Sequence, residues 1–291
     1  MRAVSKRKRV IITGANGGMG RACTRLLGAT MDLILTDAAP ALSDFTQELR
    51  TEGYTVTNSI CGNLGTADVL AAVEESLVDN AGFDALIHTC GLPPSAPWRQ
   101  VMEVNYIATL RLLARLEPFM RHGSAAVLVG SVAGHLAPVT PTLEALLAEP
   151  LGDNFFEALE EQLHDLAGPA GTKIFGLLSY SLSKHRVIRL CAERAQDWGS
   201  RGARIVSISP GMIYTPMGRH EADSDPLAGR LVTATPAGRW GTSMEIAHAV
   251  RFLLDPVASF ITGSDLLVDG GGLASAGTNA PAVWLENLRH S

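Results

Sequence analysis

The chain has 291 residues, of which 46% are hydrophobic and 18% are charged. This composition is sufficient for a sizeable core and excludes a disordered or solvating polymer. A net charge of −5 argues against nonspecific binding to a polyanion such as nucleic acid. A basic run at residues 2–9 is interpreted as a solvated end before the first strand.

The cysteines and the hydropathy pattern indicate the compartment. Four cysteines (Cys23, Cys61, Cys90 and Cys191) are far apart and form no CxxC pair, so neither a disulfide framework nor a metal site is predicted. No window approaches 18 apolar residues, and the apolar run after the basic end is too short for a signal peptide. We therefore expect a cytoplasmic protein without a membrane span.

Short apolar runs alternate with segments of helical length along the chain. The predicted strands are 9–13, 32–37, 55–60, 85–91, 125–131, 204–210 and 265–269. The predicted helices are 18–30, 43–52, 66–79, 99–121, 180–199 and 243–254. Nearly continuous apolar strands are typical of a parallel sheet buried on both faces. The pattern predicts one α/β domain over residues 1–291, doubly wound, with a seven-stranded parallel sheet and helices on both faces.

One segment, about 135–178, breaks this alternation because it contains no convincing strand. Thr140 followed by Pro141 predicts a helix start, and Asp153 is a candidate cap for a second helix. The apolar residues of that second helix share one face: Phe155, Leu159, Leu163 and Leu166. We interpret the segment as a helical insertion that is a packed surface excursion, a lid or a block to oligomer formation.

A glycine-rich turn, residues 13–20, lies between the first predicted strand and the first helix. Glycines let the backbone turn sharply and approach a diphosphate, and the helix start offers unpaired N–H groups to that anion. The turn therefore predicts nucleotide binding. Asp37 ends the second strand, where a carboxylate accepts hydrogen bonds from an adenosine ribose and repels a 2′-phosphate, which favours NAD over NADP. Arg21 is a nearby cation that complicates this preference.

Tyr180 and Lys184 are four residues apart on one face of a predicted helix. A nearby ammonium favours the phenolate, and a tyrosine with a lowered pKa exchanges protons with a carbonyl or alcohol oxygen. Ser131 follows the fifth strand, at the sheet edge where open α/β domains bind ligands. Together with the glycine turn, these residues predict a catalytic site.

Six motifs in order make the chain, from about residue 8 to 272, resemble a short-chain dehydrogenase/reductase with a Rossmann-like fold. The matching positions are Thr13-Gly14 with Gly18 and Gly20, Asn105, Ser131, Tyr180 with Lys184, Pro210-Gly211 with Thr215, and 268–271. The resemblance implies hydride transfer between a nicotinamide and a carbinol carbon. It further implies that Tyr180 is the acid/base, that Ser131 holds the substrate oxygen, and that Lys184 binds the nicotinamide ribose and lowers the Tyr180 pKa. Asn105 would hold a water that links Lys184 to solvent.

Further positions are expected to bind the cofactor or depart from the family. The expected cofactor-binding residues are Gly14, Asn16, Gly18, Met19, Gly20, Asp37, Asn63, Leu64, Cys90, Gly91, Tyr180, Lys184, Pro210, Gly211, Ile213 and Thr215. Where the family often has Asn-Asn-Ala-Gly, this chain has His88-Thr89-Cys90-Gly91, and we interpret His88 and Cys90 as packing substitutes. Asn63 stands where the family usually has an aspartate that contacts adenine.

Ser131 and Tyr180 are 49 positions apart, more than in most members of the family. This spacing resembles the bacterial 3α-hydroxysteroid dehydrogenase/carbonyl reductase subgroup, whose insertion obstructs the common tetramer interface. A homodimer is implied. Residues 212–237 correspond to the family's substrate lid, and their composition suits an apolar substrate such as a steroid. The alternatives are a non-catalytic NAD-binding or sensing protein and, opposed by the glycine spacing, a nucleotide-sugar epimerase or dehydratase.

Overall fold

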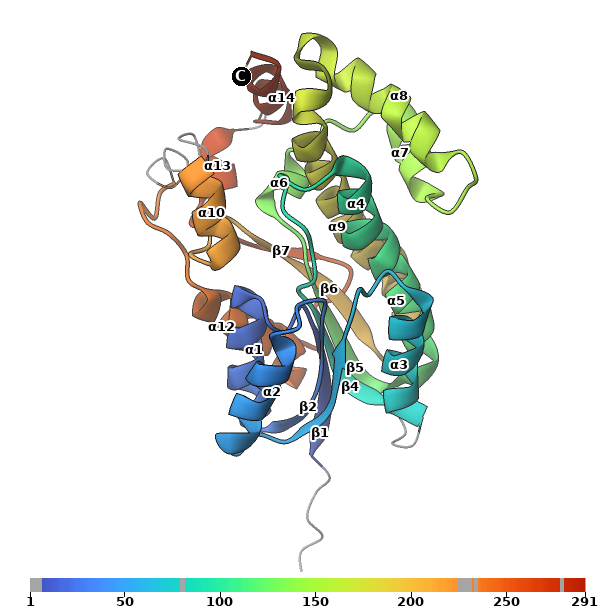
Figure 1. Cartoon of the computed structure of the whole chain (residues 1–291), viewed down its shortest axis with the longest axis vertical. Coiled ribbons are helices and arrows are strands. Elements are labelled where there is room, and N and C mark those ends of the chain that lie inside the picture. The colour runs from blue at the N-terminus through green and yellow to red at the C-terminus, as the bar shows by residue number, and fades with distance from the viewer. Residues whose placement is uncertain (1–6, 79–81, 225–231, 233–234, 278–279, 291) are drawn as a thin grey trace, which may run out of the picture.

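The computed structural model describes residues 7–78, 82–224, 232, 235–277 and 280–290. These residues form a seven-stranded parallel sheet in the order β3-β2-β1-β4-β5-β6-β7 (Figure 1). Its strands are β1 (Lys8–Thr13), β2 (Met31–Asp37), β3 (Val56–Cys61), β4 (Phe83–His88), β5 (Met120–Val129), β6 (Arg204–Pro210) and β7 (Asp265–Val268). The predicted doubly wound α/β fold is confirmed. The strand order reverses between β1 and β4, which sets the ligand crevice at their carboxyl ends.

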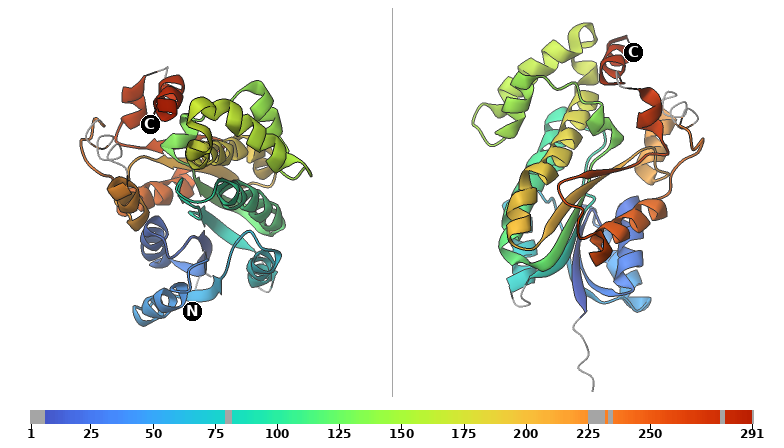
Figure 2. Two further views of the ribbon diagram at one scale, coloured as in Figure 1. Left: turned by 45° about the horizontal axis from the view of Figure 1, so that its top comes forward. Right: turned by 180° about the vertical axis from the view of Figure 1, so that it is seen from behind.

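Helices cover both faces of the sheet (Figures 1 and 2). One face carries α1 (Gly18–Gly28), α2 (Leu42–Thr51) and α12 (Ser243–Leu254), and the other carries α3 (Ala67–Val78), α5 (Ala108–Leu116) and α9 (Phe175–Ser200). Alternate strand residues enter the two cores: Val10 and Ile12 pack on the α1 side, whereas Ile11 packs on the α9 side. The two-residue period of a strand is the cause of this division.

The prediction of one regular helix over 99–121 is wrong in two respects: the segment is not a continuous α-helix, and it ends before residue 121. The segment begins with α4 (Trp98–Met102), continues as a π-helix, η1 (Glu103–Ile107), and then as α5. A short turn, η2 (Glu117–Phe119), follows, and β5 already begins at Met120. Pro118 explains the early end, because a proline cannot continue the hydrogen bonding of a helix.

The segment before α9 is helical, as predicted. It comprises α6 (Val132–His135), α7 (Pro141–Ala148), α8 (Phe155–Ala167) and η3 (Gly168–Ile174). Thr140 caps α7, since its hydroxyl accepts a hydrogen bond from Leu143 N, so that prediction is confirmed. The prediction that Asp153 caps α8 is wrong: Asn154 precedes the helix, which begins where Phe155 enters the core. We refer to α7, α8 and the residues between them, 149–154, as the insertion.

The insertion packs on α4, η1 and α9. Arg99 of α4 pairs with Glu160 of α8 at 2.6 Å, and the Tyr106 hydroxyl donates to Leu147 O at 2.6 Å. Glu144 of α7 accepts from Arg186, a buried residue of α9, at 2.7 Å. The insertion therefore covers one face of the α4–α9 helix pair.

The remaining elements lie toward the carboxyl end of the chain. They are α10 (Pro216–Ser224), η4 (Pro256–Ala258), α13 (Gly272–Ala276) and α14 (Ala280–His290). Part of the expected lid, 225–231 and 233–234, lies outside the described residues. Among the residues described, no helix is both long and apolar enough to cross a membrane.

Candidate active site

At the glycine turn after β1, the backbone lies close to the segment after β4 and to the start of helix α1. Gly14 adopts a φ of 66°, and a Cβ there would lie 2.8 Å from Cys90 N. A Cβ on Gly20 would lie 2.1 Å from Gly14 O. Helix α1 begins here without a side-chain cap and without an acidic residue in its first turn, so its N–H groups face the crevice unopposed. This arrangement fits the diphosphate of a dinucleotide.

A groove of about 810 Å³ runs from the glycine turn past the ends of β2 and β3. Many of the sequence-predicted cofactor residues line it: Gly14, Asn16, Gly18, Met19, Gly20, Asp37, Asn63, Leu64, Cys90, Gly91 and Thr215. Sequence reasoning missed Gln100, Glu103 and Val104, which α4 and η1 bring to the opposite wall. No motif marks these three residues, because their position depends on how the helix packs against the sheet.

Asp37 presents a carboxylate to the groove. Its two oxygens accept hydrogen bonds from Asn16 N at 2.9 Å and from Ala39 N at 2.8 Å. Arg21 does not line the groove; its guanidinium donates to Asn16 Oδ1 at 2.7 Å and lies 4.2 Å from the centre of the Phe45 ring. Arg21, the cation that complicated the predicted preference for NAD, is thus held beside the groove and not in it.

A smaller cavity, of about 100 Å³, adjoins the groove and contains three of the four residues predicted for catalysis, all but Asn105. Ser131, Tyr180 and Lys184 line it together with Met19, Gly91, Pro210, Gly211, Ile213 and Thr215. Ser131 Oγ also caps α6 by accepting from Ala133 N at 3.1 Å, which fixes the serine at the end of β5. Tyr180 and Lys184 come from α9, with the Lys184 Nζ 5.8 Å from the centre of the tyrosine ring.

Lys184 is buried, and its Nζ donates a hydrogen bond to Val129 O at 2.9 Å. Burial lowers the pKa of this ammonium to about 8, because little solvent remains to stabilise the charge. The lysine is therefore fixed in place, and its ammonium gives up a proton more easily than that of an exposed lysine while staying mostly charged near pH 7.

Asn105 lies one layer behind the cavity, in the π-helix η1. Its side-chain amide bonds both backbone groups of Leu92, accepting from N at 2.7 Å and donating to O at 3.1 Å. A Cβ on Gly91 would lie 3.3 Å from Asn105 Oδ1 and 3.4 Å from Lys184 Nζ. Asn105 and Lys184 thus both approach Gly91, where a larger side chain would be in tight contact with the two of them.

Comparisons with known proteins agree with this arrangement. The family model described as "short chain dehydrogenase" matches residues 8–141, and the one described as "Enoyl-(Acyl carrier protein) reductase" matches 170–272. A "Short-chain dehydrogenase/reductase bsc3" from Alternaria brassicicola is 31% identical over 282 residues, which cover 91% of this chain and 95% of that protein. The chain belongs to the short-chain dehydrogenase/reductase family. Residues 142–169, between the two matches, hold most of the insertion.

Two hydroxysteroid dehydrogenases are among the relatives of this short-chain dehydrogenase/reductase. A "3-alpha-hydroxysteroid dehydrogenase/carbonyl reductase" from Comamonas testosteroni is 30% identical, covering 90% of this chain and 95% of that one. The crystal structure of the 3-alpha-hydroxysteroid dehydrogenase from Pseudomonas sp. B-0831 complexed with NADH has a TM-score of 0.73 and 29% identity. That comparison covers 93% of this chain and all of the other.

Two departures from the family motif lie at the site: Cys90 lines the groove, and His88 lies beneath it. His88 of this short-chain dehydrogenase/reductase is buried, and burial lowers its pKa to about 3. Its ring nitrogens each lie 2.7 Å from a threonine hydroxyl, of Thr13 and of Thr109. Burial raises the pKa of the Cys90 thiol to about 11. Both side chains are therefore neutral near pH 7, and His88 bridges strand and helix instead of facing the cavity.

Proposed function

We propose that this protein is an NAD-dependent oxidoreductase that interconverts a secondary alcohol and a ketone. The observation that carries the proposal is that Ser131, Tyr180 and Lys184 line one cavity at the end of a dinucleotide-sized groove. A bound nicotinamide would supply or accept the hydride. The chain's own residues would position the reacting oxygen and move the proton.

Each residue has a distinct role in this proposal. Tyr180 gives its phenolic proton to the ketone oxygen or takes one from the alcohol. Ser131 donates a hydrogen bond that holds the same oxygen beside the phenol. Lys184 binds the nicotinamide ribose and places a positive charge near Tyr180, 5.8 Å from its ring. Asn105 holds the water that connects Lys184 to solvent.

Several observations support NAD over NADP. The Asp37 carboxylate lies in the groove, where it accepts from a ribose diol and repels a 2′-phosphate. Arg21 is occupied by Asn16 and Phe45, and so leaves this repulsion uncompensated. The Pseudomonas relative was crystallised with NADH.

A bulky apolar carbonyl compound such as a steroid is the proposed substrate. Met212, Ile213 and Met217 line the cavity beside Tyr180 and give it apolar walls. Two relatives carry the name hydroxysteroid dehydrogenase, and the one from Comamonas testosteroni is also named a carbonyl reductase.

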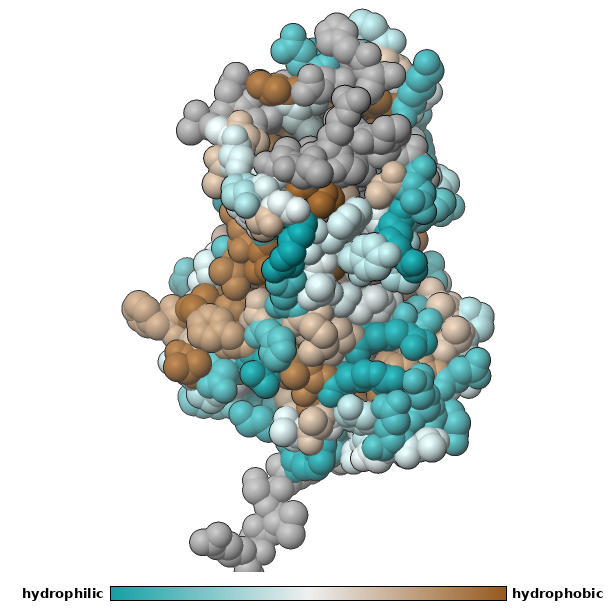
Figure 3. Space-filling view, turned by 90° about the vertical axis from the view of Figure 1, so that its left-hand side faces the viewer, coloured by the Kyte–Doolittle hydropathy of each residue, from teal (hydrophilic) through white to brown (hydrophobic). Residues whose placement is uncertain are grey.

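A homodimer is the proposed assembly, through the side formed by α12, η4 and β7. Figure 3 shows hydrophobic side chains gathered on this side. Exposed apolar residues there are Phe252, Val257, Phe260, Leu266 and Leu267. The insertion covers the α4–α9 face, whereas the α12 side keeps these apolar residues exposed among the residues described and so available for self-association. A solution mass of two chains is expected, and a stable tetramer would contradict it.

The proposed location is the cytoplasm. The four cysteines are free thiols, which suits a reducing compartment.

The experiment combines the purified protein with a panel of secondary alcohols and ketones that includes 3-hydroxysteroids and 3-ketosteroids. We expect turnover with NAD or NADH, followed by absorbance at 340 nm, and weaker turnover with the phosphorylated cofactors. Cofactor binding without turnover of any compound would favour a non-catalytic NAD-binding protein instead.

A further inference from the structure

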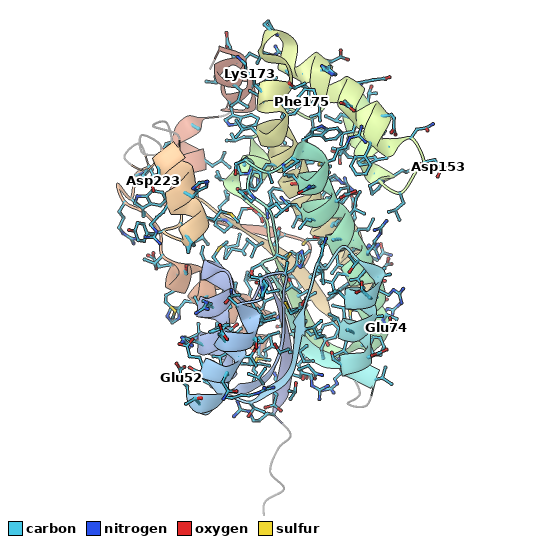
Figure 4. All side chains as sticks on the ribbon, in the orientation of Figure 1. Glu52, Glu74, Asp153, Lys173, Phe175 and Asp223 are labelled. Carbon is cyan, nitrogen blue, oxygen red and sulfur yellow. The ribbon has the colours of Figure 1, made fainter. Side chains whose placement is uncertain are left out.

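A second cavity, of about 560 Å³, lies beneath the tip of the insertion. The tip is the segment 150–154 between α7 and α8, and Asp153, labelled in Figure 4, belongs to it. Across the cavity from the tip are the loop after β3 and one side of η1 and α5. The residues on that opposite wall include Asn63, Thr66, Glu103, Val104 and Arg111.

This cavity shares a wall with the cofactor groove. Asn63, Glu103 and Val104 line both spaces. Asn63 follows β3, which lies outside β2 and Asp37 in the sheet, so the shared wall is at the adenine end of the groove if the ribose binds at Asp37. The smaller cavity around Tyr180, by contrast, is lined by no residue of the insertion. The insertion thus adjoins the groove at the end away from the reaction.

Both ends of the tip are anchored on neighbouring helices, one on α4 and the other on η1, which forms part of this wall. The Arg99 guanidinium pairs with Glu160 at 2.6 Å and lies over the rings of Trp98 and Phe156, at 4.9 Å and 5.5 Å. On the other side, Tyr106 of η1 holds Leu147 O. Leu151 stays 59% exposed at the tip, although it lines the cavity. An apolar side chain is thereby held over the cavity that adjoins the groove, and it stays more than half exposed among the residues that the structure describes.

The charges and surfaces of the cavity suit a purine base. Glu103 and Asp153 outnumber the one cation, Arg111, so a phosphate is disfavoured. A base with an exocyclic amine offers donors to Asn63 and Glu103 and an apolar face to Leu151. We infer that the insertion tip is the outer wall of the adenine site and contributes to holding the adenine of the dinucleotide. This inference rests on the proposed function and adds a binding role for the insertion.

The test compares a dinucleotide with a probe that lacks adenine. The affinities of NADH and of reduced nicotinamide mononucleotide are measured by calorimetry for the intact chain, for Leu151→Ser and for a control, Val78→Ser. Val78 is a similarly exposed apolar residue (62%) at the far end of α3. We expect Leu151→Ser to lower the affinity for NADH about 3- to 10-fold, which is the effect of removing a partly buried apolar contact. The affinity for the mononucleotide should not change. Val78→Ser should change neither.

A second measurement does not depend on a substitution. Hydrogen exchange of the peptide that spans 149–156 should slow when NADH is added and not when the mononucleotide is added. The inference is overturned if the NADH affinity of Leu151→Ser equals that of the intact chain, or if this substitution lowers the affinities of NADH and of the mononucleotide equally. It is also overturned if NADH leaves the hydrogen exchange of the tip unchanged. If the intact chain binds neither probe, the proposed function itself fails.

Discussion

The Nε2 atom of His88 lies 2.7 Å from the Thr109 hydroxyl, which in turn donates to Asn105 O at 2.9 Å. Because the one hydroxyl proton of Thr109 goes to Asn105 O, Nε2 must carry the imidazole proton and Nδ1 must accept from Thr13. A single chain of hydrogen bonds therefore connects the end of β1 with the π-helix that carries Asn105. His88 stabilises the position of Asn105 without facing the cavity.

Replacing His88 by leucine should cost about 2–4 kcal/mol of unfolding free energy at pH 7.5, because two buried hydroxyls lose their partner. Urea denaturation measures this change. The control is Thr24→Val, since the Thr24 hydroxyl is buried without a hydrogen-bond partner among the described residues and its loss should be nearly neutral. Equal, small effects of the two substitutions would show that the chain of hydrogen bonds does not stabilise the fold.

His88 should also make the free energy of unfolding depend on pH. The folded protein holds the pKa of His88 near 3, whereas an unfolded histidine titrates near 6.5. Below pH 6.5 the unfolded state takes up a proton that the folded state excludes, so stability falls as the pH falls from about 6.5 toward 3. The His88→Leu protein lacks this loss. We expect its deficit relative to the natural chain to shrink by about 2 kcal/mol between pH 7.5 and pH 4.5, and a constant deficit would contradict the account.

Lys184 should lower the free energy of unfolding, because its ammonium is buried at the candidate active site. Its folded pKa is about 8 against an ordinary 10.5, so the folded state pays for a buried charge below pH 8. Lys184→Met should therefore raise the unfolding free energy of the cofactor-free protein by about 2 kcal/mol at pH 7, after allowance for the lost hydrogen bond to Val129 O.

The pH dependence separates this effect from a general gain in packing. Between pH 8 and 10.5 the unfolded chain keeps a proton that folded Lys184 has released, so the natural chain becomes more stable as the pH rises. The advantage of Lys184→Met should shrink over that window in thermal unfolding experiments. An advantage that is independent of pH, or a loss of stability at pH 7, would be inconsistent with a buried ammonium.

Cofactor choice should be reversible at the end of β2. Asp37→Ser combined with Ala38→Arg removes the carboxylate and adds a cation at an exposed position that lines the groove. The ratio of kcat/KM for NADPH to that for NADH should rise about 100-fold, because repulsion of the 2′-phosphate is replaced by attraction. Ala38→Arg alone, which keeps Asp37, is the matched control and should give a smaller rise. A natural chain that already prefers NADPH would refute the role given to Asp37.

The sequence was most informative where chemistry restricts the residue type. The glycines at 14 and 20 predicted a close approach of the backbone at the start of the first helix, and in the structure a side chain at either position collides with backbone. Tyr180 and Lys184 could be paired because four residues make one helical turn. The β-branched runs of the strands likewise predicted the sheet, because parallel strands are buried on both faces.

Tertiary packing decided what the sequence could not. Val104 reaches the groove because the π-helix packs against α9 and bonds the loop after β4, and no local pattern signals that. The start of α8 depends on the burial of Phe155, so the local preference of Asp153 for a cap position was overridden. The place of the insertion beside the cofactor groove depends on contacts such as that of Arg99 with Glu160, which are 61 residues apart.

The proposed reaction depends most on Tyr180 as the proton donor beside a bound nicotinamide. The most direct measurement follows deuterium from C4-labelled NADH into the carbinol carbon of the product by mass spectrometry, for the natural chain and for Tyr180→Phe. We expect label transfer by the natural chain, and a rate about 10²- to 10⁴-fold lower for Tyr180→Phe at an unchanged NADH affinity. Label transfer at the natural rate without the phenol would contradict the account.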